Sequence, residues 1–508
     1  MLIRVGGSAL LALSLFSCGE DAGAPAYDPY APVRTAVPLA IAVSPDGLGP
    51  LDSTSPAAAP LAFGGSPYGL QSGVLSPTTS TPEAEEHIAI NPLNSCVWVA
   101  AVSDFSIRGG FNTTKYAVTY DFATTWQEAF LPVSGAGNGG SVITSDGQAF
   151  DANSDPVVAF DRLGNVYIVN LYINQGSKKN GIYVSVKSVG SSGPLTFSSA
   201  DVLPVVKNVS NPVTNSEDKE WIAVDNSTGS STFKGRVYVS WSRFNTSGTG
   251  SRIMLTWSGN QAGTWSAPIQ LSPVSQNGAV QGSQVAVGPD GTVYVAYDVA
   301  VVGGHQVFFT KSTDGGVTWP TPVSITPIFT EVNFTSSYRK DSFPSLAMNP
   351  APVSGQTYGE IYVVYPDQAG ANSEIKFISS TVNGTTFSAP IAINDVSTGQ
   401  RLMPSITADD RNNIHVAWFD TRNGSDAQTY DIYATRGSFS TGSLLFSSNA
   451  RVTPSSMTTG SSFIGDYGGI ASSSLDDAGV LWGFAVPVWT GSGSSRILKT
   501  ALLAYTNP

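Results

Sequence analysis

A short apolar segment with a small residue at its centre recurs along most of the chain, and this repeat limits what the chain can fold into. The central residue is Ala in six copies and Thr in one, and successive copies lie 60 to 70 residues apart. The central residues are Ala89, Ala159, Ala223, Ala286, Ala347, Thr407 and Ala471. A regular period of this length, with strands in each unit, predicts a propeller or another repeat array. A small residue suits the innermost strand of a propeller blade, because the strands converge on the axis there.

Each copy is followed by the patterns of further strands. The second strand has β-branched residues around a ring, as in Val293–Val295, which suits a strand pressed between neighbouring sheets. A third strand such as Gln306–Thr310 and a fourth such as Ala389–Ile393 complete the unit. Only 12% of the residues are charged, and 52 Gly and 32 Pro fit many short strands and turns. We therefore predict an all-β propeller of four-stranded blades, with seven blades favoured and six as the alternative.

The hairpin turn between the third and fourth strands has its clearest form at Ser312–Trp319. Asp314 can accept hydrogen bonds from backbone N–H groups across the turn, the two glycines that follow permit positive φ, and Trp319 can plug the fold beneath. Weaker copies occur at Thr119–Trp126, Ser258–Trp265 and Ser380–Phe387.

This turn and the repeat around it resemble the Asp-box, or BNR, repeats of the sialidase-like β-propellers, and the resemblance covers residues 83–508. It implies that loops entering the first strands and loops leaving the second strands share one face near the central channel. It also implies that the Asp-boxes lie at the outer edge of the opposite face, where they are structural. Because propellers carry many different functions, the resemblance says more about fold than about activity.

The seventh repeat ends without a fourth strand, so we expect a strand from elsewhere to close the last blade. The best candidate is Arg34–Ser44, which is rich in β-branched and aliphatic residues. It lies within residues 18–82, a segment rich in Pro, Ala and Ser that otherwise reads as a tether.

Residues 1–17 read as a secretory signal, with an apolar run from Ala9 to Phe16. The run ends in Leu-Phe-Ser before Cys18, which resembles a bacterial lipobox, so we expect Cys18 to be lipidated and the protein to be anchored in the bacterial cell envelope. The alternative is an ordinary signal peptide with a chance cysteine. Cys96 is the only other cysteine, and we expect it to be a buried, unreactive thiol with no disulfide in the mature domain.

The resemblance also suggests which side chains meet a ligand. Sialidases hold the substrate carboxylate with three arginines, and Arg243, Arg401 and Arg422 are the candidates here, with Asp341 as a further substrate-binding residue. The first repeat lacks the aromatic-Arg-Ile-Pro segment of true sialidases. That departure favours a protein that binds its ligand without cleaving it, or one with a specificity different from that of true sialidases.

The catalytic candidates follow the same resemblance. Tyr467 would be the nucleophile and Glu217 or Glu220 its partner, while Asp466 and Asp420 would exchange protons or bind hydroxyl groups. We expect Asp466, Tyr467, Asp420 and the arginines Arg401 and Arg422 to form one pocket wall.

Two functional classes remain open. One is a glycan-active enzyme, such as a sialidase-like glycoside hydrolase, and the other is a non-catalytic propeller that binds glycan or protein at a cell surface. A net charge of −12 argues against nucleic acid as a partner. No cofactor is required by any motif, although loop carboxylates such as those of Asp420–Asp431 could hold Ca²⁺. We expect a monomer that meets the membrane through its lipid anchor only.

Overall fold

The computed structural model describes most of the chain from residue 83 onward, together with residues 73–74. The described ranges are 73–74, 83–108, 111–121, 125–132, 142–174, 176–229, 231–245, 250–336, 338–353, 355–356, 359–409, 412–424, 429–440, 443–453, 456–458, 464–475, 479–486 and 499–505. Within them the fold is all-β, with two short 3-10 helices, η1 (Ser199–Asp201) and η2 (Val274–Gln276). Among these residues there is no helix long and apolar enough to cross a membrane.

The strands pair into sheets that share one order, in which the first strand of each repeat is innermost. From the innermost strand outward, the first four sheets are β2 (Glu83–Ile90), β3 (Trp98–Arg108), β4 (Phe111–Thr119), β5 (Gln127–Phe130); β8 (Ala152–Phe160), β9 (Asn165–Ile173), β10 (Asn180–Ser188), β11 (Val202–Asn208); β12 (Asn215–Val224), β13 (Val237–Asn245), β14 (Ser251–Ser258), β15 (Ile269–Gln270); and β16 (Val280–Val287), β17 (Val293–Val301), β18 (Gly304–Ser312), β19 (Val323–Ser324).

Three more sheets continue this order. They are β20 (Ser345–Met348), β21 (Ile361–Ala369), β22 (Asn372–Ser380), β23 (Ile391–Ala392); β24 (Arg401–Ala408), β25 (Ile414–Asp420), β26 (Thr429–Ser440), β27 (Ser443–Phe446); and β30 (Gly469–Leu475), β31 (Gly479–Val486), β32 (Lys499–Tyr505), β1 (Gly73–Val74). Two short strands, β28 (Ala450–Arg451) and β29 (Met457–Thr458), also pair with β26, and β6 (Val142–Ile143) pairs with β7 (Ala149–Phe150).

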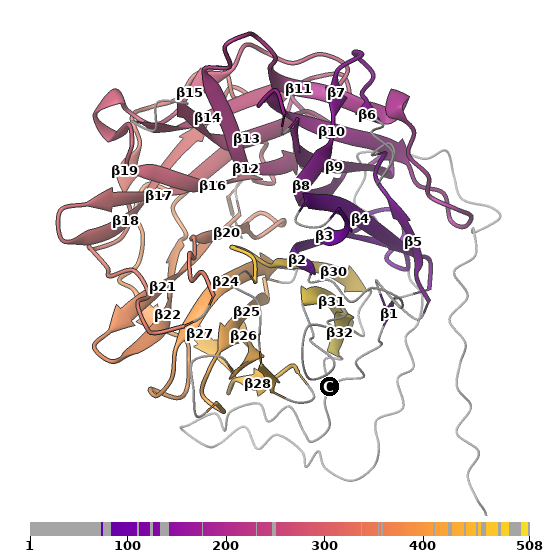
Figure 1. Ribbon diagram of the computed structural model, residues 1–508. Coiled ribbons are helices and arrows are strands. Elements are labelled where there is room, and N and C mark those ends of the chain that lie inside the picture. Colours follow the sequence, from indigo (N-terminus) through magenta and orange to yellow (C-terminus); the bar gives the residue numbers. More distant parts are fainter. Residues whose placement is uncertain are drawn as a thin grey trace, which may run out of the picture.

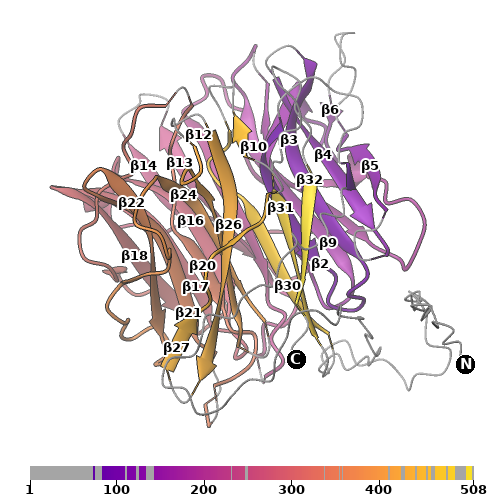
Figure 2. The same cartoon turned by 90° about the horizontal axis from the view of Figure 1, so that it is seen from below.

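The sheets are the blades of a propeller. Figure 1 looks along its axis and Figure 2 looks across it. The innermost strands contact one another in the order β2, β8, β12, β16, β20, β24, β30, and β30 contacts β2 again, so the ring of seven sheets is closed. Closure matters because an open ring would expose unpaired or unpacked strand faces.

The small residues of the repeat lie where the sequence predicted. Ala89, Ala159, Thr407 and Ala471 all line a pocket of about 290 Å³ between the innermost strands. The aromatic residue at the centre of the second strand is fully buried, as at Tyr167 and Tyr294. The apolar cores lie between neighbouring blades, because each sheet offers two apolar faces.

The last blade obtains its fourth strand from the N-terminal part of the chain. β1 pairs antiparallel with β32, with Gly73 opposite Thr500 and Val74 opposite Lys499. An N-terminal closing strand is therefore present, but it is formed by Gly73–Val74. Residues 34–44, where the sequence analysis expected it, lie outside the described residues.

The turn at Ser312–Trp319 has the hydrogen bonds that its sequence predicts. Asp314 accepts from the backbone N–H of Thr318 at 2.9 Å, from the Thr318 hydroxyl at 2.6 Å and from the Ser312 hydroxyl at 2.7 Å. Burial alone would raise the pKa of Asp314, but these hydrogen bonds lower it to about 2. Trp319 is half-buried and donates its indole N–H to the Gly316 carbonyl at 3.0 Å.

Cys96 differs from its expectation. It is buried, as predicted, but it is disulfide-bonded, so it is not the free thiol that the sequence analysis expected. The chain's other cysteine, Cys18, lies outside the described residues.

Candidate functional site

The innermost strands of five blades carry the same bulge at the end where the chain enters them. The strand pairing shifts register between Ala84 and His87 in β2, and the other four strands shift at the corresponding point. One residue in each bulge has positive φ; these residues are Glu85, Asp155, Lys219, Gly282 and Met403. Positive φ is uncommon outside glycine and costs on the order of 1 to 3 kcal/mol at each such residue, and strain of this kind gathers at functional sites.

The bulges bring charged side chains from several blades together at the axis. Lys219 places its Nζ 2.8 Å from Oδ2 of Asp466 and 3.8 Å from Oε1 of Glu85. Arg339, which precedes β20, donates its Nε–H to Oδ1 of Asp466 at 2.9 Å. These residues, with Asp155, Asp218 and Glu220, are called the central cluster below.

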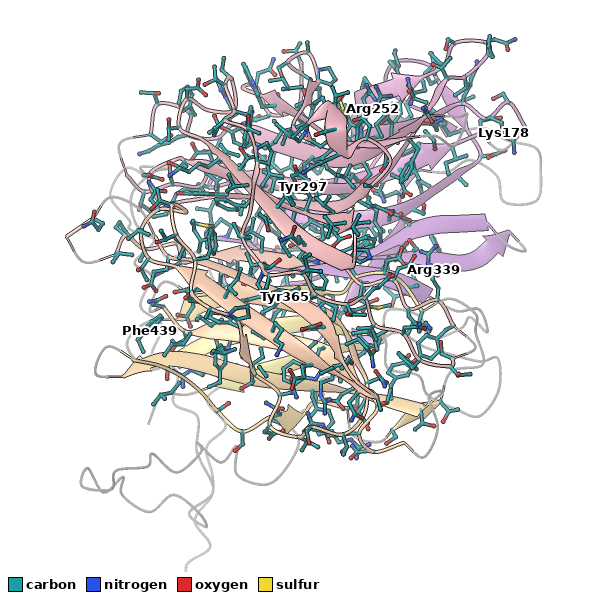
Figure 3. All side chains as sticks on the ribbon, turned by 90° about the vertical axis from the view of Figure 1, so that its left-hand side faces the viewer. Lys178, Arg252, Tyr297, Arg339, Tyr365 and Phe439 are labelled. Atoms are coloured by element: carbon teal, nitrogen blue, oxygen red, sulfur yellow. The ribbon has the colours of Figure 1, made fainter. Side chains whose placement is uncertain are left out.

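The central cluster has a buried floor and an open rim. Glu85 and Glu220 are each 2% exposed, whereas the side chain of Arg339 is 47% exposed. Figure 3 shows Arg339 at one face of the ring and Phe439, at the turn between β26 and β27, at the other. The cluster therefore opens on the face opposite the hairpin turns, as the family resemblance implied.

Five carboxyl groups with two cations cannot all ionise in such a place, and their pKa values are driven apart. Burial and the charge of Asp155 raise the pKa of Glu85 and of Glu220 well above the ordinary range, and they raise the pKa of Asp218 to about 7. Burial would also raise the pKa of Asp466, but the Lys219 and Arg339 cations hold it below its ordinary value. The pKa values of these neighbouring carboxyl groups are thus shifted in opposite directions, as they are in sites that perform acid–base catalysis.

Tyr467 lies beside the central cluster and is held as a neutral phenol. Its hydroxyl donates to the Pro156 carbonyl at 3.1 Å, and its ring meets that of Trp221 edge-on with the centroids 5.9 Å apart. Burial and the nearby carboxylates, Glu85 first among them, raise the pKa of Tyr467 well above its ordinary value. A phenol in this state is poorly suited to the nucleophile role that the resemblance suggested.

Glu217 is not the partner of Tyr467, because its carboxylate is already occupied. It is fully buried and accepts from Arg243 Nε at 2.9 Å, from the Trp241 indole at 2.5 Å and from Asn208 at 2.9 Å. Arg243 lies directly across the β12–β13 ladder from Glu217. The pair joins two strands of one blade and satisfies both charges.

Arg401, Asp420 and Arg422 form a second such network, in the blade of β24 to β27. Asp420 is fully buried, lies 3.1 Å from Nε of Arg401 and accepts from Arg422 at 2.7 Å. Arg401 also donates to backbone carbonyls, including that of Ser373 at 2.7 Å. Arg243 lies in the sheet of β12, and the sheets of β16 and β20 separate it from this network in the ring. The structure therefore does not bring the three arginines together, and Asp466 and Tyr467 do not share a wall with Arg401 and Asp420.

Asp341 lies beside the central cluster, next to Arg339. Its side chain is 49% exposed, 3.6 Å from Nε of Arg339, and it lines a pocket beside the central cluster. Of the candidates, Asp466, Tyr467, Glu220 and Asp341 thus gather around the axis. Asp155, Asp218, Lys219 and Arg339 also precede first strands and were expected at this end of the ring, but no role was assigned to them; Glu85 was missed. Their position before a first strand could be read from the sequence, but the bulge that turns their side chains toward the axis could not.

Metal binding finds no support in the part of the chain that the structure describes. No group of three or more His, Cys, Asp or Glu residues there is arranged to hold a metal ion. At the two ends of the segment expected to offer Ca²⁺ ligands, Asp420 binds Arg422 and Asp431 binds Arg451 at 2.7 Å.

Comparison with known proteins finds distant structural likenesses and no matching sequence family. No protein-family model matches the chain, and no curated protein matches it. Among solved structures, similarity is found to a protein of unknown function from Dyadobacter fermentans (10% identity, 85% of this chain and 97% of that chain, TM-score 0.44). It is also found to an α-L-arabinanase of Penicillium chrysogenum in complex with arabinobiose (10% identity, 85% and 97%, TM-score 0.44). A Hadza microbial sialidase is similar at 13% identity over 80% and 76% of the two chains, with a TM-score of 0.41. Likenesses this distant carry no argument about activity, so the function must be argued from the site.

Proposed function

We propose that this chain is a sialidase-like, Asp-box propeller that cleaves glycosidic bonds with carboxyl groups of its central cluster. The observation that carries the proposal is that the register shifts of β12 and β8 place two half-buried carboxyl groups, Asp218 and Asp155, together at the axis. Burial and the charge of Asp155 raise the pKa of Asp218 to about 7. Glycoside hydrolysis needs such a pair, with one member protonated to donate to the leaving oxygen and the other ionised.

The roles follow from burial and from existing partners. Asp218 is half-buried at the rim, and its raised pKa keeps it protonated near neutral pH, so it is the general acid. Asp155 is the base or nucleophile. Asp466 is committed to Lys219 and Arg339, and it fixes those two cations around the acid pair.

The proposal does not include the recognition of sialic acid by three arginines, because Arg243, Arg401 and Arg422 are engaged in ion pairs within their own blades.

The test is turnover of aryl glycosides by the full chain and by matched variants. Asp218→Asn and Asp155→Asn should each lower kcat by about 10² to 10⁴ while leaving the urea midpoint near that of the parent. The value of kcat/KM should fall as pH rises through about 7, since Asp218 then loses its proton. Glu374→Gln, on β22 and paired with Lys376, is the control and should change neither. Unchanged turnover in Asp218→Asn would refute the assignment.

A second candidate is a non-catalytic propeller that binds a cell-surface glycan or protein. The half-exposed charges of Arg339 and Asp341 at the rim favour it, because accessible charges can bind a partner without any chemistry. A parent protein that binds glycans but turns none over, and an Asp218→Asn variant that binds equally well, would select this candidate.

Attachment to the bacterial envelope is a proposal that rests on the sequence. The signal-like residues 1–17 and the lipobox-like context of Cys18 support it, and we propose a monomer that is carried at the membrane by lipid on that cysteine. Because the chain has only two cysteines, this proposal requires a lipidated form without a disulfide between Cys18 and Cys96.

A further inference from the structure

A pocket of about 260 Å³ opens beside the central cluster, between the blades of β16 and β20. It shares Asp341 and Phe343 with the surroundings of that cluster, because Arg339 contacts Asp341 and Lys219 lies over the Phe343 ring at 5.0 Å. A ligand group in this pocket would therefore lie next to the carboxyl pair proposed above.

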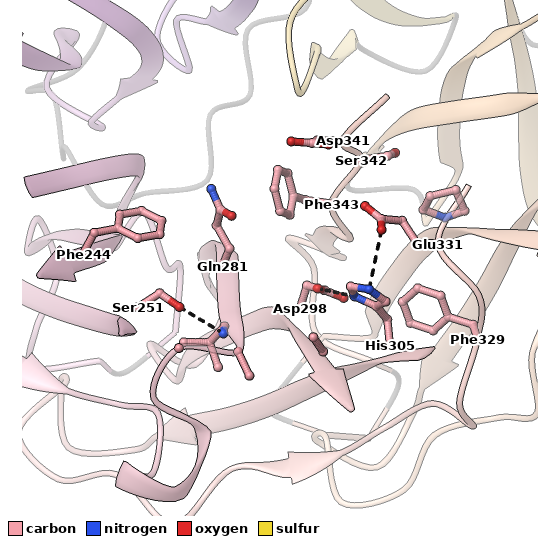
Figure 4. Close-up of a pocket in the computed structure, with 15 residues that line it drawn as sticks. Phe244, Ser251, Gln281, Asp298, His305, Phe329, Glu331, Asp341, Ser342 and Phe343 are labelled. Atoms are coloured by element: carbon pink, nitrogen blue, oxygen red, sulfur yellow. Dashed lines mark hydrogen bonds and ion pairs between the residues drawn. The ribbon is translucent and has the colours of Figure 1, made fainter. Parts of the chain in front are cut away.

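A histidine between two carboxylates forms the polar side of the pocket. His305 places Nδ1 at 2.8 Å from Oδ2 of Asp298, whereas its Nε2 lies 3.8 Å from Oε2 of Glu331 (Figure 4). The first distance is a hydrogen bond and the second is too long to be one. Nε2 of His305 and the Glu331 carboxylate are therefore close enough for one ligand group in the pocket to contact both.

The group that suits such a pair is a hydroxyl. It can donate to the Glu331 carboxylate and, with its oxygen, accept from His305 when Nε2 carries a proton. A carboxylate in the same position would face Glu331, Asp298 and Asp341, which would repel it.

The remaining walls suit the other parts of a sugar. In the view of Figure 4, Gln281 lies between Phe244 and Phe343, and all three line the pocket. The side-chain amide of Gln281 makes no hydrogen bond to another residue of the described part of the chain, so its donors and acceptor are open to hydroxyl groups. The two aromatic rings can cover the apolar C–H face of a pyranose or furanose.

We propose that this pocket is a saccharide subsite that binds an uncharged, hydroxyl-rich sugar unit and discriminates against acidic sugars. The inference deepens the proposed function, on which it rests for its substrate class, and it assigns the selectivity to Glu331, His305 and Gln281.

The experiment measures binding to the full chain by isothermal titration calorimetry, and then steady-state kinetics. The probes are arabinobiose, cellobiose and mannobiose as neutral disaccharides, with digalacturonic acid as the acidic one. We expect at least one neutral probe to bind and digalacturonic acid to bind at least tenfold more weakly. Glu331→Gln and Gln281→Ala should each weaken the neutral probe on the order of tenfold, because the first replaces a charge-assisted hydrogen bond to the ligand with a neutral one and the second removes a hydrogen bond. Glu374→Gln, an equivalent loss of charge outside the pocket, should leave the Kd unchanged.

The two proposals fail separately. If Glu331→Gln raises KM without lowering kcat, while Asp218→Asn lowers kcat, both stand. If neutral probes bind through Glu331 but no glycoside is cleaved, the subsite stands and the hydrolase proposal fails. Equal binding of digalacturonic acid and the neutral probes, or a Kd that Glu331→Gln and Gln281→Ala leave unchanged, would overturn the subsite.

Discussion

Replacing Arg401 by alanine tests whether this residue is a buried structural cation or a ligand contact. Arg401 and Asp420 are both fully buried, and the guanidinium also donates to the carbonyls of Ser373, Gly399 and Thr398 at 2.7, 3.2 and 2.8 Å. The substitution leaves Asp420 without one of its cations and removes the donors to three carbonyls. Breaking a buried ion pair from one side costs about 3 to 5 kcal/mol. Because Arg422 still contacts Asp420, we expect the lower end, about 3 kcal/mol.

The assay is urea unfolding followed by tryptophan fluorescence, with the midpoint and slope fitted together. Arg252→Ala is the matched control, since Arg252 is half-buried and makes one long hydrogen bond, 3.4 Å to Asn215; it should cost less than about 1 kcal/mol. The double variant Arg401→Met with Asp420→Asn should recover part of the loss, because no unpaired buried charge remains. An Arg401→Ala protein that unfolds at the parent's urea concentration and yet loses glycan binding would show that our placement of Arg401 is wrong.

Four further outcomes are expected. Asp218 has a pKa of about 7 in the folded protein against an ordinary 3.8. Its contribution to the free energy of unfolding is therefore complete at low pH and is lost as pH rises through 7. The urea midpoint of Asp218→Asn should accordingly vary less between pH 4 and pH 8 than that of the parent. A chain beginning at Glu83 lacks β1 and should melt below one beginning at Tyr68, which keeps Gly73–Val74, whereas equal melting temperatures would remove β1 from the closing role. Trp319→Ala should cost about 2 kcal/mol, below the range for a fully buried tryptophan, because the ring is only half-buried, and glycan turnover should survive in the folded fraction. Cys18→Ser should release the protein from membranes, and mass spectrometry of the unreduced N-terminal peptide tests the anchor directly. The Cys18 thiol can carry lipid or join a disulfide such as that of Cys96, but it cannot do both. A disulfide-linked N-terminal peptide would therefore contradict lipid anchoring.

The repeat and its turns could be predicted from the sequence because their causes are local. A small residue at one register, such as Ala159 or Ala471, is required wherever strands converge, and Asp314 with its glycines specifies a turn whatever lies around it. That the loops entering the first strands lie at one end of the ring also follows from the order of strands within each repeat, whereas the binding of a ligand at that end stays a prediction. The closing strand was expected from the missing fourth strand, but the residues that form it were not, because a two-residue strand such as Gly73–Val74 has almost no pattern of its own.

The selection of site residues was decided by the tertiary structure. Glu217 and Asp218 are neighbours in sequence, yet Glu217 forms an ion pair with Arg243 on the adjacent strand β13, whereas Asp218 belongs to the central cluster. The alternation of side chains along a strand, and the bulge that interrupts it, separate the two. The sequence by itself determined a propeller with a charged face. Which charges neutralise one another inside a blade, and which remain to meet a ligand, depends on distances between blades that no local pattern contains, because a charge is satisfied by whatever group the fold places beside it.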